Sequence, residues 1–210
     1  MTVGDFVDQL ASPAPVPGGG AASALSAAFA AALVRMVVAL STGKPKYAAY
    51  EASLRRAGDL AARAQDRLLT LADEDAAAYA RLAAAFKMPR ETAGEQGVRQ
   101  TAIRTGARDS ALAPFQVLQA CWDVLAAAES VAGRSNVNAR SDTSTAASLA
   151  EAAARGAAAN VLINLPMTGD EEFNGETSVS VVGLLEQVAD LAARAREASG
   201  TDELRDPEPE

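Results

Sequence analysis

The sequence contains no histidine and only one cysteine among its 210 residues. The missing histidine excludes catalytic triads of the usual kind and histidine-ligated metals, so we expect chemistry without a metal cofactor. Any proton transfer must use Asp, Glu, Lys or Tyr. The lone Cys121 cannot form an internal disulfide, and we interpret it as a small core side chain in a protein from a reducing compartment.

Aromatic residues make up only 4% of the chain, and Val, Ile and Thr form no alternating runs typical of strands. Alanine, the strongest helix former, supplies roughly a quarter of the residues. About half of the side chains are apolar, which is enough for one sizeable core. We predict an all-α protein, an elongated antiparallel helix bundle with one domain over residues 1–200. Residues 201–210 form an acidic tail whose Pro and Glu content predicts disorder.

Positive charge is also scarce, because the net charge is −8 and only three of the nineteen basic residues are lysines. Nucleic acid is therefore an unsuitable partner. The longest apolar stretch, residues 21–40, is mostly alanine and too weakly hydrophobic for a membrane span. The N-terminus has no basic region ahead of an apolar segment, so we expect no signal peptide. We predict a soluble, cytoplasmic protein that does not interact with membranes.

Proline, glycine and polar segments divide the chain into predicted helices. Their ranges are about 2–10, 20–41, 47–86, 92–131, 142–165 and 179–199. We expect Pro114 to kink or divide the fourth helix, Ser141 or Asp142 to cap the fifth, and residues 169–177 to form an acidic loop.

Asp75 lies where the third helix should be buried. Apolar residues between Leu54 and Leu82 alternate in spacings of three and four, which predicts the seam of a bundle, and Asp75 occupies one seam position. An unpaired buried charge is costly. The carboxylate is therefore either paired, holding the bundle in register, or an acid or base with a shifted pKa in a cleft.

Two amides, Asn160 and Asn164, lie one turn apart on a stripe that also carries Gly156. They could bind a planar polar ligand together, or they could bond to the backbone of a neighbouring helix. Asn136 and Asn138 precede the same helix and could complete such a site, although asparagine in a turn needs no ligand.

Lys44 and Lys46 stand in the turn after the second helix, where two of the three lysines suggest an anionic ligand. Gly18, Gly19 and Gly20 begin that helix and could present free amides to an anion. The residues that complete a Walker loop do not follow, which excludes an ordinary nucleotide triphosphatase. Tight helix packing explains the glycines equally well.

Taken together and in order, these segments resemble the cyclodeaminase/cyclohydrolase family of folate enzymes. The resemblance covers about residues 3–165 and, more weakly, the last helix. The matching segments are Ala11-Ser12-Pro13, Pro17-Gly18-Gly19-Gly20, Gly43-Lys44-Pro45-Lys46-Tyr47, Asp75-Ala76-Ala77-Ala78-Tyr79, Lys87-Met88-Pro89-Arg90, Asn136-Val137-Asn138-Ala139-Arg140-Ser141-Asp142 and Asn160-Val161-Leu162-Ile163-Asn164-Leu165.

The resemblance implies a homodimer that binds a tetrahydrofolate derivative in a cleft and acts on its one-carbon bridge. One family reaction closes 5-formiminotetrahydrofolate to 5,10-methenyltetrahydrofolate with loss of ammonia, and the other hydrolyses the methenyl compound to 10-formyltetrahydrofolate. No counterpart of the formiminotransferase domain of the animal enzymes is expected in this sequence. A non-catalytic folate-binding or scaffold protein of the same fold is the alternative.

For that substrate, Asp75 or Asp142 would stabilise the cationic bridge or move a proton. Lys44 and Lys46 would meet the glutamate tail, and the four asparagines would bond the pterin edge. The sequence departs from the family pattern at Pro45, where another lysine is common, and at Arg134-Ser135, where Gly-Asn is usual.

Overall fold

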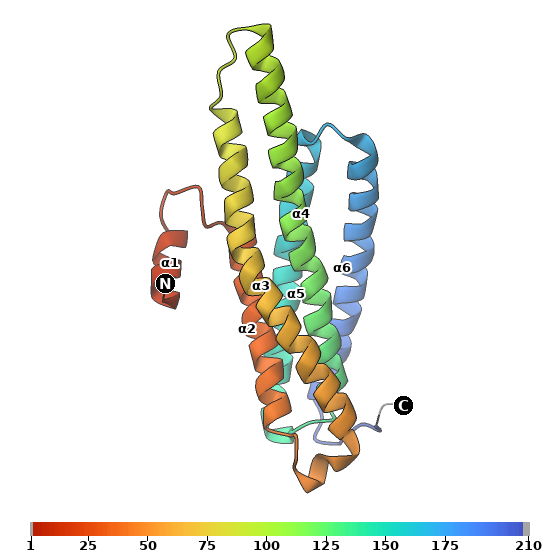
Figure 1. Ribbon diagram of the computed structural model, residues 1–210. Coiled ribbons are helices and arrows are strands. Elements are labelled where there is room, and N and C mark those ends of the chain that lie inside the picture. The colour runs from red at the N-terminus through yellow and green to blue at the C-terminus, as the bar shows by residue number, and fades with distance from the viewer. Residues whose placement is uncertain (1, 208–210) are drawn as a thin grey trace.

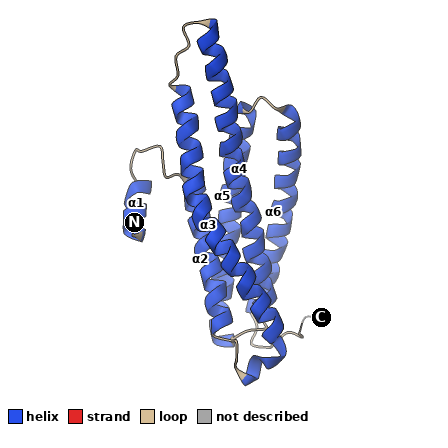
Figure 2. Ribbon diagram, viewed as in Figure 1, coloured by secondary structure: helices blue, strands red, loops and turns tan. Residues whose placement is uncertain are grey.

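The computed structural model describes residues 2–207, and this part of the chain contains helices and no strand (Figures 1 and 2). The prediction of an elongated, antiparallel, all-α bundle is confirmed. The α-helices are α1 (Val3–Leu10), α2 (Gly19–Ala39), α3 (Glu51–Phe86), α4 (Ala93–Val131), α5 (Arg140–Asn164) and α6 (Glu171–Ser199). Short 3₁₀ turns are η1 (Pro45–Tyr50), η2 (Val137–Ala139) and η3 (Leu165–Met167).

Helix α2 lies inside the bundle between α3 and α5 and also contacts α4, while α6 covers α4 and α5 on the other side (Figure 1). The buried side of α2 is made almost entirely of small residues such as Ala24, Ala27 and Ala31. Small side chains let helix backbones approach closely, which is why an alanine-rich sequence can still fill its core. Cys121 is fully buried in that core as predicted, and burial raises the pKa of its thiol to about 12.

The hairpin of α3 and α4 extends beyond the other helices at one end of the molecule (Figure 1). The third predicted helix begins later than expected, at Glu51, because Pro45 starts a separate 3₁₀ turn in which Tyr47 and Tyr50 are buried. Helix α4 is neither divided nor interrupted by Pro114, which lies inside one continuous helix. A single proline removes only one backbone hydrogen bond, and tertiary packing on both sides retains the helix.

Two predicted helix starts were wrong. Helix α5 begins at Arg140 after η2, so Ser141 and Asp142 lie in its first turn and neither is its cap. Helix α6 begins at Glu171, and the expected acidic loop over 169–177 is mostly helix. The Asp170 side chain accepts a hydrogen bond from the Phe173 amide at 3.0 Å. Asp170 is therefore an N-cap, and the acidic residues after it favour a helix start through the helix dipole.

The acidic tail, predicted to be disordered, is bonded to the bundle as far as Asp206. The Tyr50 hydroxyl donates to the Arg205 carbonyl at 2.9 Å, and Arg134 Nε donates to the Asp206 carbonyl at 2.8 Å. Arg205 also forms an ion pair with Glu129 at 2.9 Å. Arg134, one of the positions that depart from the family pattern, thus holds the tail against the bundle. Residues 208–210 of the predicted tail lie outside the described residues.

Helices α2 and α4 are long and apolar enough to cross a membrane by length and composition alone, but 50% and 61% of their most apolar windows are buried inside the bundle. Such burial is typical of core helices in soluble proteins. The cytoplasmic location stays a prediction.

Candidate functional site

The glycine-rich start of α2 packs directly against Asp75 of α3. A methyl group added at Gly20 would lie less than 3.0 Å from three atoms of the Asp75 carboxyl group. The backbone amide of Ala21 donates a hydrogen bond to the same carboxylate. Because the cap residue Gly18 offers no side chain, Asp75 caps α2 from a neighbouring helix. This contact is compatible with both interpretations of Asp75, the structural carboxylate and the catalytic acid or base.

Burial raises the pKa of the Asp75 carboxyl above its ordinary value, and the hydrogen bond from Ala21 lowers it by a smaller amount. No basic side chain contributes to this shift. A carboxyl group in this setting is a better proton acceptor than an exposed one, which is the condition that acid and base catalysts meet.

Helix α5 meets α2 at the same place. Asn160 lies beside Gly19, where an added methyl group would approach its Nδ2 atom to 3.3 Å. One turn earlier, a methyl group at Gly156 would lie 2.5 Å from Ser23 Oγ, so this glycine permits the close approach of α2. Ser23 Oγ itself donates to the Gly19 carbonyl at 2.8 Å. We call Gly19, Gly20, Ser23, Asp75 and Asn160 the polar junction.

The two predicted amides have different environments. Asn160 Nδ2 donates to the Gly156 carbonyl at 2.8 Å within α5, which leaves its oxygen as an acceptor at the junction. Asn164 Nδ2 instead donates to the Ser110 carbonyl of α4 at 3.0 Å and to the Asn160 carbonyl at 2.8 Å. Proline at position 114 has no amide hydrogen for the carbonyl four residues earlier, which is that of Ser110. Asn164 therefore satisfies the carbonyl that Pro114 leaves free.

Two hydroxyl groups in this region were not predicted from the sequence. Ser23 is buried at the polar junction. Ser110 is 4% exposed, and its Oγ is buried without a hydrogen-bond partner among the described residues. In the sequence, Ser110 could have been found from its position four residues before Pro114. Ser23 could have been found from its position one turn after Gly19.

The remaining predicted site residues lie at the other end of α2. The Asn136 amide donates to Ser41 Oγ at 2.8 Å, and its Nδ2 donates to the Leu40 carbonyl at 3.4 Å. Asn136 Oδ1 accepts from the Asn138 amide at 3.1 Å, as in an ordinary asparagine turn. We call residues 44–46 the basic turn. Lys44 and Lys46 are both exposed there, and the Lys46 ammonium lies 5.6 Å from the centre of the Tyr47 ring.

Within one chain, therefore, the structure does not bring the predicted residues into one cleft. Gly20 and Ala39 are nineteen helical residues apart on α2, which corresponds to roughly 28 Å. Asp142 is separated from Asn160 by eighteen residues of α5, which corresponds to roughly 27 Å. Asp75, Gly19, Gly20 and Asn160 lie together, whereas Lys44, Lys46, Asn136, Asn138 and Asp142 lie at the opposite end.

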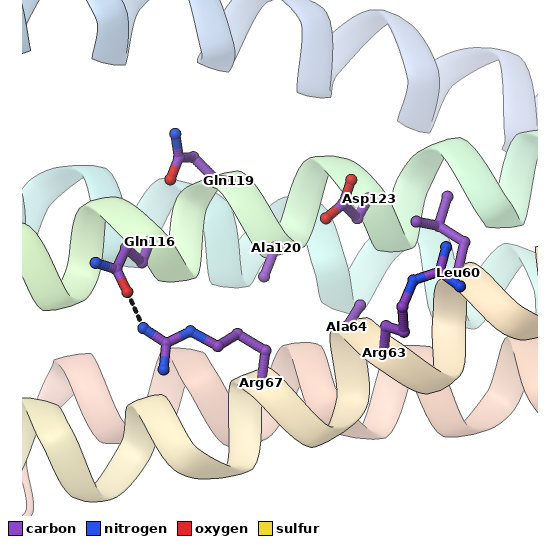
Figure 3. Close-up of a pocket in the computed structure, with 8 residues that line it drawn as sticks. All are labelled: Leu60, Arg63, Ala64, Arg67, Gln116, Gln119, Ala120 and Asp123. Carbon is purple, nitrogen blue, oxygen red and sulfur yellow. Dashed lines mark hydrogen bonds between the residues drawn. The ribbon is translucent and has the colours of Figure 1, made fainter.

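A separate groove of about 420 Å³ runs between α3 and α4 (Figure 3). Arg67 bonds Gln116 across it and forms an ion pair with Glu74 at 2.9 Å. Burial raises the pKa of Asp123 in the groove, and the nearby positive charge of Arg63 lowers it less. Because Arg67 is already bonded to Gln116 and paired with Glu74, this groove is less suited to a charged ligand than the polar junction.

Residues 2–182 match the family model of the formiminotransferase-cyclodeaminases. The chain belongs to this family. The resemblance inferred from the separate segments is therefore confirmed, and the match extends into the first part of α6, as far as residue 182. The methenyltetrahydrofolate cyclohydrolase of Methylorubrum extorquens is 35% identical over 196 residues, which cover 93% of this chain and 94% of that protein.

The solved structure of a formiminotetrahydrofolate cyclodeaminase from Thermotoga maritima superimposes with a TM-score of 0.85 at 28% identity, covering 95% of this chain and 96% of that one. The formimidoyltransferase-cyclodeaminase of Gallus gallus is 31% identical over 185 residues. That match covers 88% of this chain and only 34% of the animal protein. The chain thus spans about a third of the animal relative and nearly the whole of the bacterial ones.

Proposed function

We propose that the protein is a folate one-carbon enzyme that acts on the bridge between two nitrogens of a tetrahydrofolate derivative. The observation that carries the proposal is the half-buried Asp75 carboxylate at the glycine-rich start of α2, beside the free acceptor of Asn160. A binding scaffold of the same fold would not need a carboxylate with a raised pKa at this place.

The favoured reaction is hydrolysis of 5,10-methenyltetrahydrofolate to 10-formyltetrahydrofolate, because the cyclohydrolase relative is 35% identical over 93% of this chain, whereas the cyclodeaminase of known structure is 28% identical. The bridge carbon carries positive charge, which the Asp75 carboxylate stabilises. A water oxygen bonds to that carbon as Asp75 accepts one water proton, and the bond from the carbon to N5 then breaks. One proton of the water ends on N5 and the other is released, so atoms and charge balance.

The start of α2 contributes to this chemistry through its shape and its dipole. Glycines at positions 19 and 20 let the Asn160 and Asp75 side chains approach the helix start closely, and the positive end of the helix holds Asp75 in place. Asn160 is our candidate for a hydrogen bond to the pterin edge through Oδ1. Asn164 contributes indirectly, because both of its donor bonds go to backbone carbonyls.

The second candidate reaction is the deaminating cyclisation, in which Asp75 would donate a proton instead of accepting one. The structural similarity to the cyclodeaminase from Thermotoga maritima favours this candidate. There, N10 bonds to the formimino carbon and the bond to the terminal nitrogen breaks. The departing ammonia takes the N10 proton and one further proton. A carboxyl group whose pKa is raised holds a proton to a higher pH than usual and so can donate the second one.

The purified protein should be assayed with both substrates by the ultraviolet absorbance of methenyltetrahydrofolate. Loss of this absorbance with many turnovers per protein would support the hydrolase, and its appearance from the formimino compound with release of ammonia would support the deaminase. A stoichiometric perturbation without turnover would support the binding protein instead and contradict the proposal.

A further inference from the structure

The segment after α6 runs along the end of the bundle at which α2 ends and α3 begins (Figure 1). We call residues 201–206 the strap. The Leu204 side chain packs against the hydrophobic core, and the Arg205 amide donates to the Gly133 carbonyl at 2.8 Å. The strap lies outside residues 2–182, which match the family model, so the family pattern does not account for it.

Arg205 of the strap satisfies the end of α4. Its Nη1 atom donates to the Glu129 and Ala132 carbonyls at 3.3 and 3.2 Å, and its Nη2 atom pairs with the Glu129 carboxylate at 2.9 Å. The last carbonyls of a helix have no partner within the helix, and a cation there is also favourable for the helix dipole. Gly133 leaves room for this side chain, because an added methyl group would lie 2.8 Å from Arg205 Cδ.

A direct contact joins the strap to η1, the 3₁₀ turn that follows Lys44 and contains Lys46. Tyr50 is the last residue of η1, and its hydroxyl donates to the Arg205 carbonyl at 2.9 Å. Tyr50 is buried, so this hydrogen bond fixes the end of η1 against the bundle. Because η1 has only six residues, a displacement of Tyr50 also displaces the basic turn.

A second connection runs through the loop between α4 and α5. Arg134, which departs from the family pattern, donates from Nε to the Asp206 carbonyl of the strap at 2.8 Å. Further along the loop, the Val137 amide donates to the Tyr47 hydroxyl at 3.4 Å. The Lys46 ammonium lies 5.6 Å from the centre of the Tyr47 ring, a geometry that allows cation–π attraction. The position of Lys46 thus depends on a loop that the strap holds.

The charges of the strap leave the lysines available. An acidic segment beside a basic turn could neutralise it, but the strap contacts Tyr50 and Arg134 through backbone carbonyls. The Asp202 carboxylate pairs with Arg140 at the start of α5. Neither lysine of the basic turn forms an ion pair with a described residue.

We propose that the strap holds the basic turn in the orientation that binds the anionic part of the substrate, and that Arg205 and Tyr50 are its positioning residues. Neither side chain contacts the ligand, because both act through Lys44 and Lys46. The proposal rests on the proposed function for the nature of the ligand, a folate with a negatively charged glutamate tail.

The strap acts on affinity and not on the chemical step. A basic turn that is already held in place loses less conformational entropy when it binds an anion than a turn that moves freely. The chemistry is assigned to Asp75, at the opposite end of α2 from the basic turn. Loss of the strap contacts should therefore raise KM and leave kcat nearly unchanged.

The first experiment measures KM and kcat of full-length Arg205→Ala and Tyr50→Phe at low ionic strength. Each variant removes strap contacts and should raise KM about 2–10-fold, the effect of losing one or two hydrogen bonds. Arg205→Lys keeps a positive charge beside Glu129 and should recover part of the affinity. A wild-type KM in both variants, or a decrease confined to kcat, would overturn the proposal.

The matched control is Arg108→Ala. Arg108 forms an ion pair with Asp170 at 2.7 Å and so ties the start of α6 to α4. Asp170 and Gly200 cap the two ends of α6, which are roughly 45 Å apart. The control therefore removes a comparable arginine contact at the end of α6 far from the strap, and its KM should equal that of wild type.

The second experiment tests whether the strap acts through the lysines. Arg205→Ala is combined with Lys44→Ala and Lys46→Ala in one chain. If the strap positions these ammonium groups, Arg205→Ala should raise KM in the wild-type background and leave KM unchanged once the lysines are absent. An increase by the same factor in both backgrounds would show a general structural effect and overturn the proposal. Urea unfolding of the same proteins separates losses of stability from losses of affinity.

Hydrogen exchange tests the positioning without any substrate. The Lys44 and Tyr47 amides donate to the Ser41 and Lys44 carbonyls, and in Arg205→Ala both amides should exchange faster than in wild type. The Ala22 amide at the start of α2 should exchange at the wild-type rate. Unchanged exchange at the basic turn would overturn the proposal. Failure of the proposed function is distinguishable, because wild-type protein would then be inactive on both folates while exchange still reported the hold of the strap on the basic turn.

Discussion

The two ends of α2 hold polar groups in opposite ways. At its start, Asp75 is half-buried, bonded to the backbone and shifted to a raised pKa. At its end, Lys44 and Lys46 are exposed, and neither forms an ion pair with a described residue. A buried carboxylate suits proton transfer, whereas exposed ammonium groups suit the modest attraction of an anionic chain. The comparison therefore assigns chemistry to one end of the helix and anchoring to the other.

The largest effect is expected from Asp75→Asn. Asparagine retains an oxygen that can accept the Ala21 hydrogen bond, but it cannot accept a proton from water. We expect kcat to decrease about 10²–10⁴-fold with little change in melting temperature. Asp73→Asn, on the exposed side of the same helix, is the matched control and should retain wild-type turnover. Full activity in the Asp75 variant would show that the reaction does not take place at this end of α2.

Gly20→Ala tests whether the junction depends on close packing. The added methyl group meets the Asp75 carboxyl group, so either the carboxylate or the helix start must shift. We expect a stability loss of about 1–3 kcal/mol, typical of overpacking, together with a marked decrease in kcat. Gly18→Ala is the control, because an added methyl group there has no neighbour within 4 Å. Equal effects of the two substitutions in urea unfolding and turnover would argue against the packing explanation.

The sequence predicted the fold class and the inward position of Asp75, because hydrophobic periodicity depends on local spacing alone. It also singled out Gly19, Gly20 and Asn160, which do meet. The predicted helix over 20–41 already separated Gly19 and Gly20 from the basic turn by a helix length. The sequence could not predict that Asp75 and Asn160 meet the glycine end of this helix, because this depends on how α2 is oriented between α3 and α5. The start of α6 was missed because Asp170 and the acidic residues after it were interpreted by composition, although they also fit a capped helix start.

Asn164→Ala should affect stability and have little direct effect on chemistry. Its removal leaves the Ser110 carbonyl buried without a donor, which costs about 1–3 kcal/mol. The double variant with Pro114→Ala restores a backbone amide four residues after Ser110, so Asn164→Ala should cost less in that background. A double-mutant cycle of urea unfolding measures the difference. A cost independent of residue 114 would refute the compensation between Pro114 and Asn164.

Replacing both Lys44 and Lys46 by alanine should impair binding and leave the chemical step intact. Two exposed charge contacts together contribute about 1–2 kcal/mol, so we expect KM to rise about 10-fold at low ionic strength with kcat nearly unchanged. The difference from wild type should shrink at high salt. Lys87→Ala, the third lysine, lies at the far end of α3 and should leave KM unchanged. A decrease confined to kcat would contradict the division of tasks along α2.

The smallest effect concerns the pH dependence of stability. The pKa of Asp75 is raised in the folded state above its ordinary value of 3.8, so the folded form holds this proton more tightly than the unfolded chain. Its contribution to stability is thus fully present below the ordinary value and is lost as pH rises through the folded pKa. Glu51 and Asp170 have lowered pKa values and act in the opposite direction, so their contribution to stability is lost as the pH falls.

Asp75→Asn removes only the contribution of the Asp75 carboxyl group. The free energy of unfolding of the variant should therefore gain on that of wild type as pH rises through this window, and the same pKa should mark the rise of kcat/KM if Asp75 is the base. A difference in the free energy of unfolding that stays constant across this pH range would show that the carboxyl group titrates alike in the folded and unfolded chains. The two ends of α2 would then differ in the location of their charged groups and not in the pKa of Asp75.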